Sequence, residues 1–197
     1  MLALQHEERP IQNTGGLEHF LFVESAALAY DARPRRDVVS NTIVQALPLL
    51  DNAYWAQANV IRHTLDYRER QRLRSTGLSY QQNLQGVIAK VTPALTSALQ
   101  QFENKKWVLI AKDRNGYYRL IGSKEHPLEF SYQSNSGRSP QQRNEVSFSF
   151  EGEQTHSAYF VAGSVVAGFG DIPTLNEPSP QHTERVTEDG IYIRILE

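Results

Sequence analysis

Four arginines stand at alternate positions of one segment: Arg68, Arg70, Arg72 and Arg74. On a strand, alternate side chains project to the same face, so all four guanidinium groups would lie on one side; on a helix they would be spread around the axis. The planar guanidinium group forms paired hydrogen bonds with carboxylates and phosphates. This row predicts a docking surface for an acidic partner or a phosphate backbone, and the alternative is a solvated face at the edge of a sheet.

Two further arginines fall in a long polar stretch. Residues 133–144 contain Gly137, Pro140, Arg138 and Arg143. A loop of this length within a domain usually carries a function or moves. We therefore expect Arg138 and Arg143 to supply a second contact surface.

The residues needed for catalysis or metal binding form no recognisable set. The chain has no cysteine, which excludes disulfides, thiolate metal sites and cysteine nucleophiles. The six histidines lie at positions 6, 19, 63, 126, 156 and 182, and none has the spacing that brings two metal ligands to one helix or strand. Glycine-rich nucleotide-binding loops and serine-nucleophile motifs are also absent. We expect no metal, no cofactor and no enzymatic activity; an enzyme whose residues meet only on folding is the weakest alternative.

The strongest structural signal is a β-hairpin between residues 106 and 121. The runs 107–111 and 117–121 are β-branched, aromatic or otherwise mostly apolar, and Asn115-Gly116 between them is typical of a hairpin turn. Both faces of the first run are apolar, which suits a strand buried between two layers.

Further strands are predicted on both sides of this hairpin. In residues 146–150 apolar and polar side chains alternate strictly, so one face should be buried. Residues 55–73 are ambiguous: residues 61–68 alternate as a strand would, whereas residues 69–74 could equally be helical, and we favour the strand. Other extended runs are predicted at residues 18–25, 38–50, 128–132, 158–166 and 191–195.

One helix is predicted over residues 92–104. Thr92 is a suitable N-cap, and Pro93 occupies the first helical position, where its missing N–H costs nothing. Leu95, Leu99 and Phe102 then form one apolar face, which should pack against a sheet.

Length and composition indicate one domain with extended ends. A chain of 197 residues that is 40% hydrophobic can bury one sizeable core. We expect an N-terminal arm at residues 1–16, a β-sandwich domain at 17–170, and an extended C-terminal segment at 171–197 that ends in a short strand. The predicted fold class is α+β, mainly β: an antiparallel β-sandwich or barrel with one flanking α-helix and extended arms or loops.

Charge and hydropathy argue against a dedicated nucleic-acid-binding protein and against a membrane protein. The formal net charge of -2 argues against a protein dedicated to binding polyanions, although a local basic patch remains compatible with it. No segment approaches the roughly 20 apolar residues of a membrane span, and the first residues lack the pattern of a signal peptide. We expect a soluble protein.

Several of these motifs occur together in a recognisable order. They are the glycine pair at 15–16 before a strand, the capped helix, the hairpin at 108–122, the sequence Pro127-Leu128-Glu129-Phe130, and the alternating run at 146–150. This pattern, over roughly residues 85–160, resembles small structural proteins of tailed bacteriophages and prophages, particularly those of Bacteroidetes hosts.

The resemblance implies a virion protein near the tail: a tube, tube-terminating or adaptor subunit in which a β-sandwich with a flanking helix assembles into rings. Its partners would be identical copies and other tail or neck proteins, with passive contact to DNA in a lumen, and assembly would occur in the bacterial cytoplasm. The six arginines then become candidate subunit-interface residues. Segments 5–16, 133–144 and 172–188 would lie across adjacent subunits.

The alternative is a stand-alone β-sandwich module that binds a carbohydrate or a protein. Its contact residues would be the aromatic side chains Tyr117, Tyr118 and Tyr132. Tyrosines on strands also serve cross-strand packing, and ring formation would separate the two hypotheses.

Overall fold

The computed structural model describes residues 14–29, 34–37, 40–75, 77–139 and 141–169, and two short strands near the C-terminus. These two strands, β11 (Arg185–Val186) and β12 (Tyr192–Ile193), pair with each other. The other strands join one ten-stranded sheet. The fold is α+β and mainly β, as predicted. Of the expected N-terminal segment at 1–16, only residues 14–16 are described. Of the expected C-terminal segment at 171–197, only β11 and β12 are described; the rest of both segments lies outside the described residues.

The predicted hairpin is confirmed as β6 (Lys106–Asp113) and β7 (Tyr118–Ile121). Asp113 closes the turn, because its side chain accepts hydrogen bonds of 2.9 Å from the backbone N–H groups of Asn115 and Tyr117. Gly116 has a φ of 89°, a conformation that glycine adopts without steric cost.

Strand β6 is buried on both faces, as its apolar sequence predicted. Leu109 and Ala111 belong to one core cluster, whereas Val108 and Ile110 belong to a second cluster on the opposite face. Strand β1 (Leu17–Glu24) pairs antiparallel along β6 and contributes to both clusters in the same alternating way.

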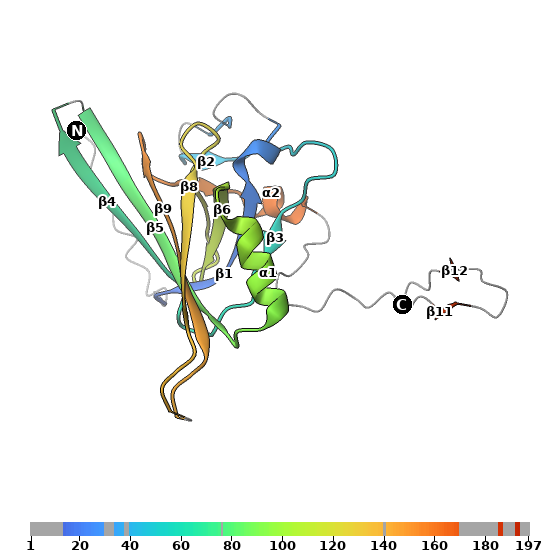
Figure 1. The fold of residues 1–197 in the computed structure, drawn as a ribbon. Coiled ribbons are helices and arrows are strands. Elements are labelled where there is room, and N and C mark those ends of the chain that lie inside the picture. The colour runs from blue at the N-terminus through green and yellow to red at the C-terminus, as the bar shows by residue number, and fades with distance from the viewer. Residues whose placement is uncertain are drawn as a thin grey trace.

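Four long strands form an antiparallel sheet that packs over the first cluster. Their order is β8-β9-β5-β4, and the bounds are Leu128–Asn135 for β8, Glu145–Gln154 for β9, Gly77–Ala89 for β5 and Asp66–Arg74 for β4. Leu84, Phe148 and Phe150 on the inner face share the cluster with Phe20 and Phe22 of β1. The result is a sandwich-like arrangement (Figure 1).

The predicted helix is confirmed as α1 (Pro93–Phe102), which ends two residues earlier than expected. The hydroxyl oxygen of Thr92 accepts a hydrogen bond of 3.1 Å from the backbone N–H of Leu95, as an N-cap should. Leu95, Leu99 and Phe102 are buried in the first cluster, and the Phe102 ring stacks on Trp107 at 4.2 Å.

The second cluster is covered by short elements. Strand β7 pairs with β10 (Tyr159–Val161), β10 pairs with β2 (Thr42–Ile43), and β3 (Ala56–Gln57) pairs with β1. The β10–β2 pair is parallel, so the sheet is mixed rather than wholly antiparallel.

The strand predicted at residues 158–166 is wrong beyond Val161. A second helix, α2 (Gly163–Ala167), follows β10, and a 3-10 turn, η1 (Ser25–Ala27), follows β1. Val165 and Val166 are both buried in the second cluster. Neighbouring side chains of a strand point to opposite faces, so a helix is what lets both valines reach one core.

Two other predictions need correction, and one long strand was not predicted. The loop expected at 133–144 begins only after Asn135, because Gln133, Ser134 and Asn135 pair with β9. In the described part of the extended run expected at 38–50, residues 40–50, only β2 forms a strand. Strand β5, with 13 residues, was not predicted, since its sequence is dominated by polar side chains.

Candidate functional site

The alternating arginines lie on β4, which confirms the strand interpretation for residues 66–74. The strand expected before Asp66 is wrong, because residues 61–64 form a turn in which His63 has a φ of 65°. Tyr67 packs against the first core cluster and Glu69 bonds to the buried Gln82. Because side chains of a strand alternate between faces, the arginines between them project outward. Arg68, Arg70, Arg72 and Arg74 are all exposed, and together they are called the arginine row below.

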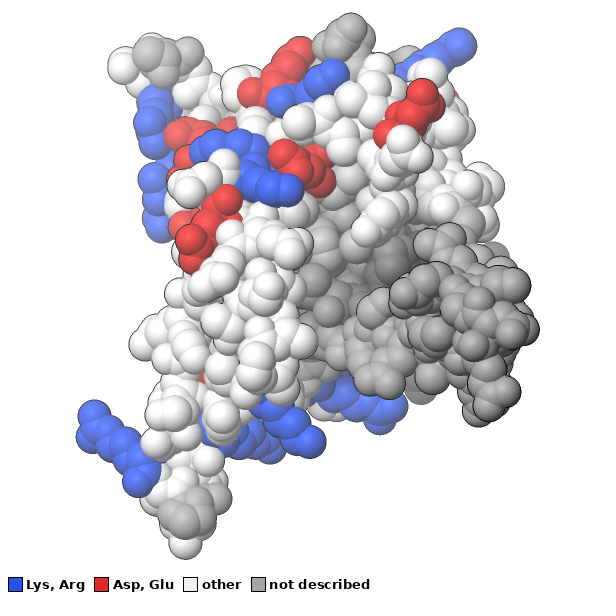
Figure 2. Space-filling model, turned by 45° about the vertical axis from the view of Figure 1, so that its right-hand side comes forward, with Lys and Arg blue, Asp and Glu red and all other residues white. Residues whose placement is uncertain are grey.

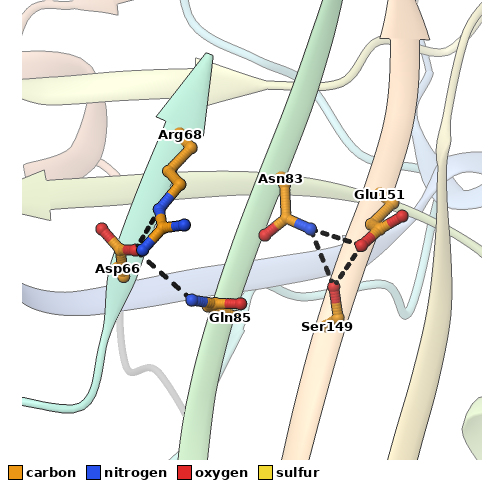
Figure 3. Close-up of polar contacts among 6 residues, drawn as sticks. All are labelled: Asp66, Arg68, Asn83, Gln85, Ser149 and Glu151. Atoms are coloured by element: carbon orange, nitrogen blue, oxygen red, sulfur yellow. Dashed lines mark hydrogen bonds and ion pairs between the residues drawn. The ribbon is translucent and has the colours of Figure 1, made fainter. Parts of the chain in front are cut away.

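The outward face beside the arginine row is polar. Arg68 forms an ion pair with Asp66 at 2.7 Å, and Asp66 also accepts a hydrogen bond of 3.3 Å from Gln85. On the next two strands the side chains of Asn83, Ser149 and Glu151 are joined by hydrogen bonds. Figure 3 shows these contacts running across β4, β5 and β9. This face is therefore suited to water or a polar partner.

The arginine row is only partly neutralised. Arg74 forms an ion pair with Glu153 of β9 at 3.2 Å. Arg70 and Arg72 form no ion pair or side-chain hydrogen bond with any described residue. Two guanidinium groups with all their donors unused remain available to a partner.

Both edges of the four-stranded sheet are open in the described part of the chain. β4 ends the strand order, so no described strand pairs with its outer edge. At the opposite edge, β8 pairs with β6 only through Leu128 and Glu129. The rest of β8, from Phe130 to Asn135, has no strand beyond it.

The β4–β5 hairpin extends past the rest of the sheet, and we call this part the arm. The last pair between β5 and β9 joins Tyr80 to Gln154, so residues 77–79 continue beyond β9; Figure 1 shows the hairpin standing away from the body. Leu73 and Leu78 face each other across the hairpin and are 81% and 51% exposed. The two leucines form a small exposed apolar patch at the tip of the arm.

Glu69 joins the base of the arm to the body. Its carboxylate accepts four hydrogen bonds, from the hydroxyls of Tyr67 (2.8 Å) and Ser157 (2.6 Å), the amide of Gln82 (3.1 Å) and the backbone N–H of Ala158 (2.7 Å). The buried Gln82 in turn accepts a bond of 3.0 Å from the backbone N–H of Gly122. The arm is therefore fixed to two loops of the body.

The hydrogen bonds to Glu69 keep its carboxylate ionised, in a structural role. Burial raises the pKa of a carboxyl group, but the hydrogen bonds from Ser157, Ala158, Tyr67 and Gln82 outweigh burial and hold the Glu69 pKa below its ordinary value. Burial, followed by the neighbouring charge of Glu69, raises the pKa of the Tyr67 hydroxyl well above its ordinary value. Glu69 is thus ionised at neutral pH and its acceptors are occupied.

Arg138 and Arg143 lie in the β8–β9 loop, at the opposite end of the sheet from the arm (Figure 1). Arg68 pairs with Asn83 of β5, which in turn pairs with Glu151 of β9. Glu151 lies six residues from Glu145, where β9 meets the loop. At the rise of a strand, six residues span about 20 Å. The structure therefore places the six candidate arginines in two separate regions.

The three tyrosines of the alternative hypothesis do not form one platform. Tyr132 packs against the first core cluster and Tyr118 against the second. Tyr117 is 58% exposed, and its ring meets Phe160 edge-on at 5.8 Å.

Sequence reasoning missed the Glu69 cluster and the arm. The alternation of Tyr67 and Glu69 with the arginines gave a signal that both face inward, but their partners are remote in sequence. Ser157 and Ala158 lie 88 and 89 residues away from Glu69, and no local pattern predicts such a contact.

Within the described ranges, no group of three or more His, Asp or Glu side chains is placed to hold a metal ion. None of the described helices is long and apolar enough to cross a membrane. Comparisons with protein-family models, with curated proteins and with solved structures each gave no match to this chain.

Proposed function

We propose that this chain is a non-catalytic structural subunit that assembles with identical copies into a ring or tube of a phage or prophage tail. The observation that supports this most directly is the β8-β9-β5-β4 sheet, which has a polar outward face and an open strand at each edge. Open edges are templates for pairing with another chain unless something blocks them.

The strand directions favour pairing of β4 in one copy with β8 in the next. Neighbouring strands of this sheet are antiparallel throughout, so β4 and β8 of one chain run in opposite directions. A copy related by rotation would present its β4 antiparallel to β8 of its neighbour, and the ladder would continue without a break. Such head-to-tail contacts close into a ring when the rotation closes.

The side chains of the two edges are compatible with this pairing. β4 brings Arg70 and Arg72, which have no described partner, while Ser131 and Gln133 lie exposed on the same outward face of β8. Guanidinium donors and hydroxyl or amide acceptors on neighbouring strands form cross-strand hydrogen bonds. The contact would thus add side-chain bonds to main-chain pairing.

The arm supplies a second contact. Leu73 and Leu78 at its tip are exposed in the single chain, and burying a leucine side chain contributes about 1.5–3 kcal/mol. A neighbouring copy that covers the tip would therefore strengthen the assembly without changing the fold of the subunit.

The resemblance to tail proteins is consistent with this geometry, since it implies rings built from β-sandwich subunits. On this proposal the protein is part of the virion, is assembled in the bacterial cytoplasm, and contacts other tail or neck proteins at the two ends of the ring. Cofactors have no place in such a role.

The proposal is tested by measuring the mass of the purified chain by light scattering, with negative-stain images of the same samples. We expect closed rings or tubes whose mass falls when NaCl rises from about 0.05 M to about 0.5 M, because salt screens exposed guanidinium contacts. The variant Arg70→Gln/Arg72→Gln should show the lower mass already at low salt, while Arg35→Gln/Lys105→Gln should not. A mass of one copy at every salt and protein concentration would contradict the proposal.

A second candidate function, a stand-alone binding module, is favoured by the surroundings of Tyr54. This side chain is 61% exposed and borders two hollows of about 500 and 390 Å³. Hollows lined by aromatic and aliphatic side chains are typical of ligand sites. Binding of a sugar or peptide that is lost in Tyr54→Ser, by a chain that stays monomeric, would favour this module.

A further inference from the structure

Five cationic side chains from four stretches of the chain gather at the end of the molecule that carries the β8–β9 loop. These residues, called the basic end, are Arg62, Lys90, Arg114, Arg138 and Arg143. Four of them are exposed and Arg114 is half-buried. Figure 2 shows this lower end with Lys and Arg and hardly any Asp or Glu, whereas both charges mix at the upper end.

Backbone contacts around the end of β5 hold these stretches together. The N–H of Lys90 donates to the carbonyl of Asn144, next to Arg143, at 3.0 Å. The N–H of Ile61, next to Arg62, donates to the carbonyl of Val87 at 2.8 Å. The fold therefore holds the stretches of Arg62, Lys90 and Arg143 together at the end of β5.

The acidic residues near the basic end are already engaged or withdrawn. Glu18 forms an ion pair with Lys112 at 2.8 Å. Asp113 accepts the backbone bonds of its turn, and Glu145 is only partly exposed. None of the five basic-end cations forms an ion pair with another described residue. Their charge is available to a ligand.

A hollow of about 380 Å³ lies within this end. Arg62, His63 and Arg114 line it together with Glu18, whose carboxylate is paired with Lys112. The guanidinium Nη2 of Arg114 lies 2.6 Å from Nδ1 of His63. That contact fixes the direction of the Arg114 side chain. A hollow bordered by two guanidinium groups and an imidazole suits an anion with several acceptor oxygens.

We propose that the basic end binds the phosphate backbone of a nucleic acid, with one phosphate in the Arg62–Arg114 hollow and neighbouring phosphates on Lys90, Arg138 and Arg143. This goes beyond the proposed assembly and does not depend on it. Five cations spread over one end match a chain of regularly spaced negative charges better than a single anion.

A protein partner fits this end less well. Interfaces between proteins depend on apolar and aromatic side chains at their centre. Of the large hydrophobic side chains exposed in the described residues, Tyr117 is the one near this end, next to the β6–β7 turn. A lone tyrosine beside cations is instead suited to stacking on a base, without sequence preference.

The experiment measures fluorescence anisotropy of labelled single- and double-stranded oligonucleotides with the full-length chain. For five phosphate contacts the logarithm of the binding constant should fall against the logarithm of the salt concentration with a slope of about −3.5 to −4.5. Arg62→Gln/Arg138→Gln/Arg143→Gln should weaken binding at least about tenfold and reduce the slope by about 2–3.

A matched control removes the same charge elsewhere. Arg35→Gln/Lys105→Gln/Lys124→Gln changes three cations outside the basic end and should leave the affinity within about twofold, because contacts beyond the Debye length are screened. Circular dichroism checks that both variants fold.

The inference is overturned if the wild-type chain does not bind at low salt, if both triple variants lose affinity equally, or if poly-glutamate competes as well as the oligonucleotide at equal charge. The last result would assign this end to an acidic protein. Light scattering of the same samples keeps the two proposals apart, since intact rings that do not bind the oligonucleotide would overturn only this one.

Discussion

Glu69 is the residue on which the position of the arm depends. Its carboxylate collects donors from β4, from β5 and from the loop between β9 and β10. Leaving such donors without an acceptor costs more than the bonds themselves contribute, because a buried polar group then loses its contact with water. A change at Glu69 should therefore affect both stability and the arm.

We expect Glu69→Gln to lower the free energy of unfolding by about 1–2 kcal/mol at pH 7, since an amide cannot accept all four bonds. The pKa of Glu69 is lowered in the folded state. Its contribution is therefore complete above the ordinary carboxyl pKa and is lost as the pH falls through the lower, folded-state value. Urea unfolding of both proteins at neutral and acidic pH measures this difference, which should shrink in acid.

Glu153→Gln is the matched control, because Glu153 pairs with Arg74 at an exposed site. Exposed ion pairs contribute about 0–1 kcal/mol, so this variant should differ little from the wild type at either pH. Equal unfolding free energies of Glu69→Gln and the wild type at pH 7 would show that Glu69 does not anchor the arm.

For individual residues, the sequence predicted the direction of a side chain well and its interaction partners poorly. The alternation at 68–74 correctly placed the arginine row on one face of a strand. It could not predict that Arg74 would meet Glu153 or that Glu69 would meet Ser157. Such pairs depend on how distant segments fold together, which a local pattern does not contain.

Among the elements, β5 shows how a polar segment can form an inner strand of the sheet, between β9 and β4. Its core residues are only Leu84 and Ile88, with Gly86 between them. A Cβ atom at Gly86 would lie 2.7 Å from the ring of Phe148 and 2.9 Å from Leu65, so the core already fills that space. Because β5 is rich in glutamine and contains glycine, its sequence does not look like a strand, and tertiary packing stabilises it.

Changes in the arm should affect assembly without affecting the stability of the single chain. We expect Leu73→Ser/Leu78→Ser to lower the mass of the assembly in light scattering. Its free energy of unfolding should change by less than about 0.5 kcal/mol, because both leucines are exposed in the single chain.

Thr92→Ala should instead lower the free energy of unfolding and leave the mass of the assembly unchanged. Loss of the N-cap of α1 costs about 1 kcal/mol of stability. Thr92 lies outside both edge strands, and α1 contacts β8 on the inner face of the sheet, through Phe102 and Phe130. An unchanged mass in the leucine variant, or a mass that falls equally in both variants, would argue against a role for the arm in assembly.

For the whole molecule, the net charge of -2 conceals an uneven distribution. Cations that form no ion pair with a described residue occur at Arg70 and Arg72 on the outward face and throughout the basic end. The alternating and apolar runs predicted the mainly β class correctly, and the hairpin and the helix were recognisable from local chemistry. The uneven distribution of charge was not, because it arises only when segments far apart in sequence meet.

The central claim is that β4 of one copy pairs with β8 of the next, and cysteine crosslinking tests it most directly. The chain has no native cysteine, so Ser131→Cys can be combined in turn with Arg68→Cys, Arg70→Cys or Arg72→Cys. Within one chain these positions are three strand spacings apart, about 14 Å, too far for a disulfide, which needs Cα atoms within about 7 Å.

We predict that one of the three combinations gives a ladder of covalent multimers on a non-reducing gel after oxidation. Ser149→Cys on the inner strand β9, combined with the same arginine substitution, should give none. Single-chain bands from all three combinations, in samples that light scattering shows to be multimeric, would contradict the β4–β8 contact.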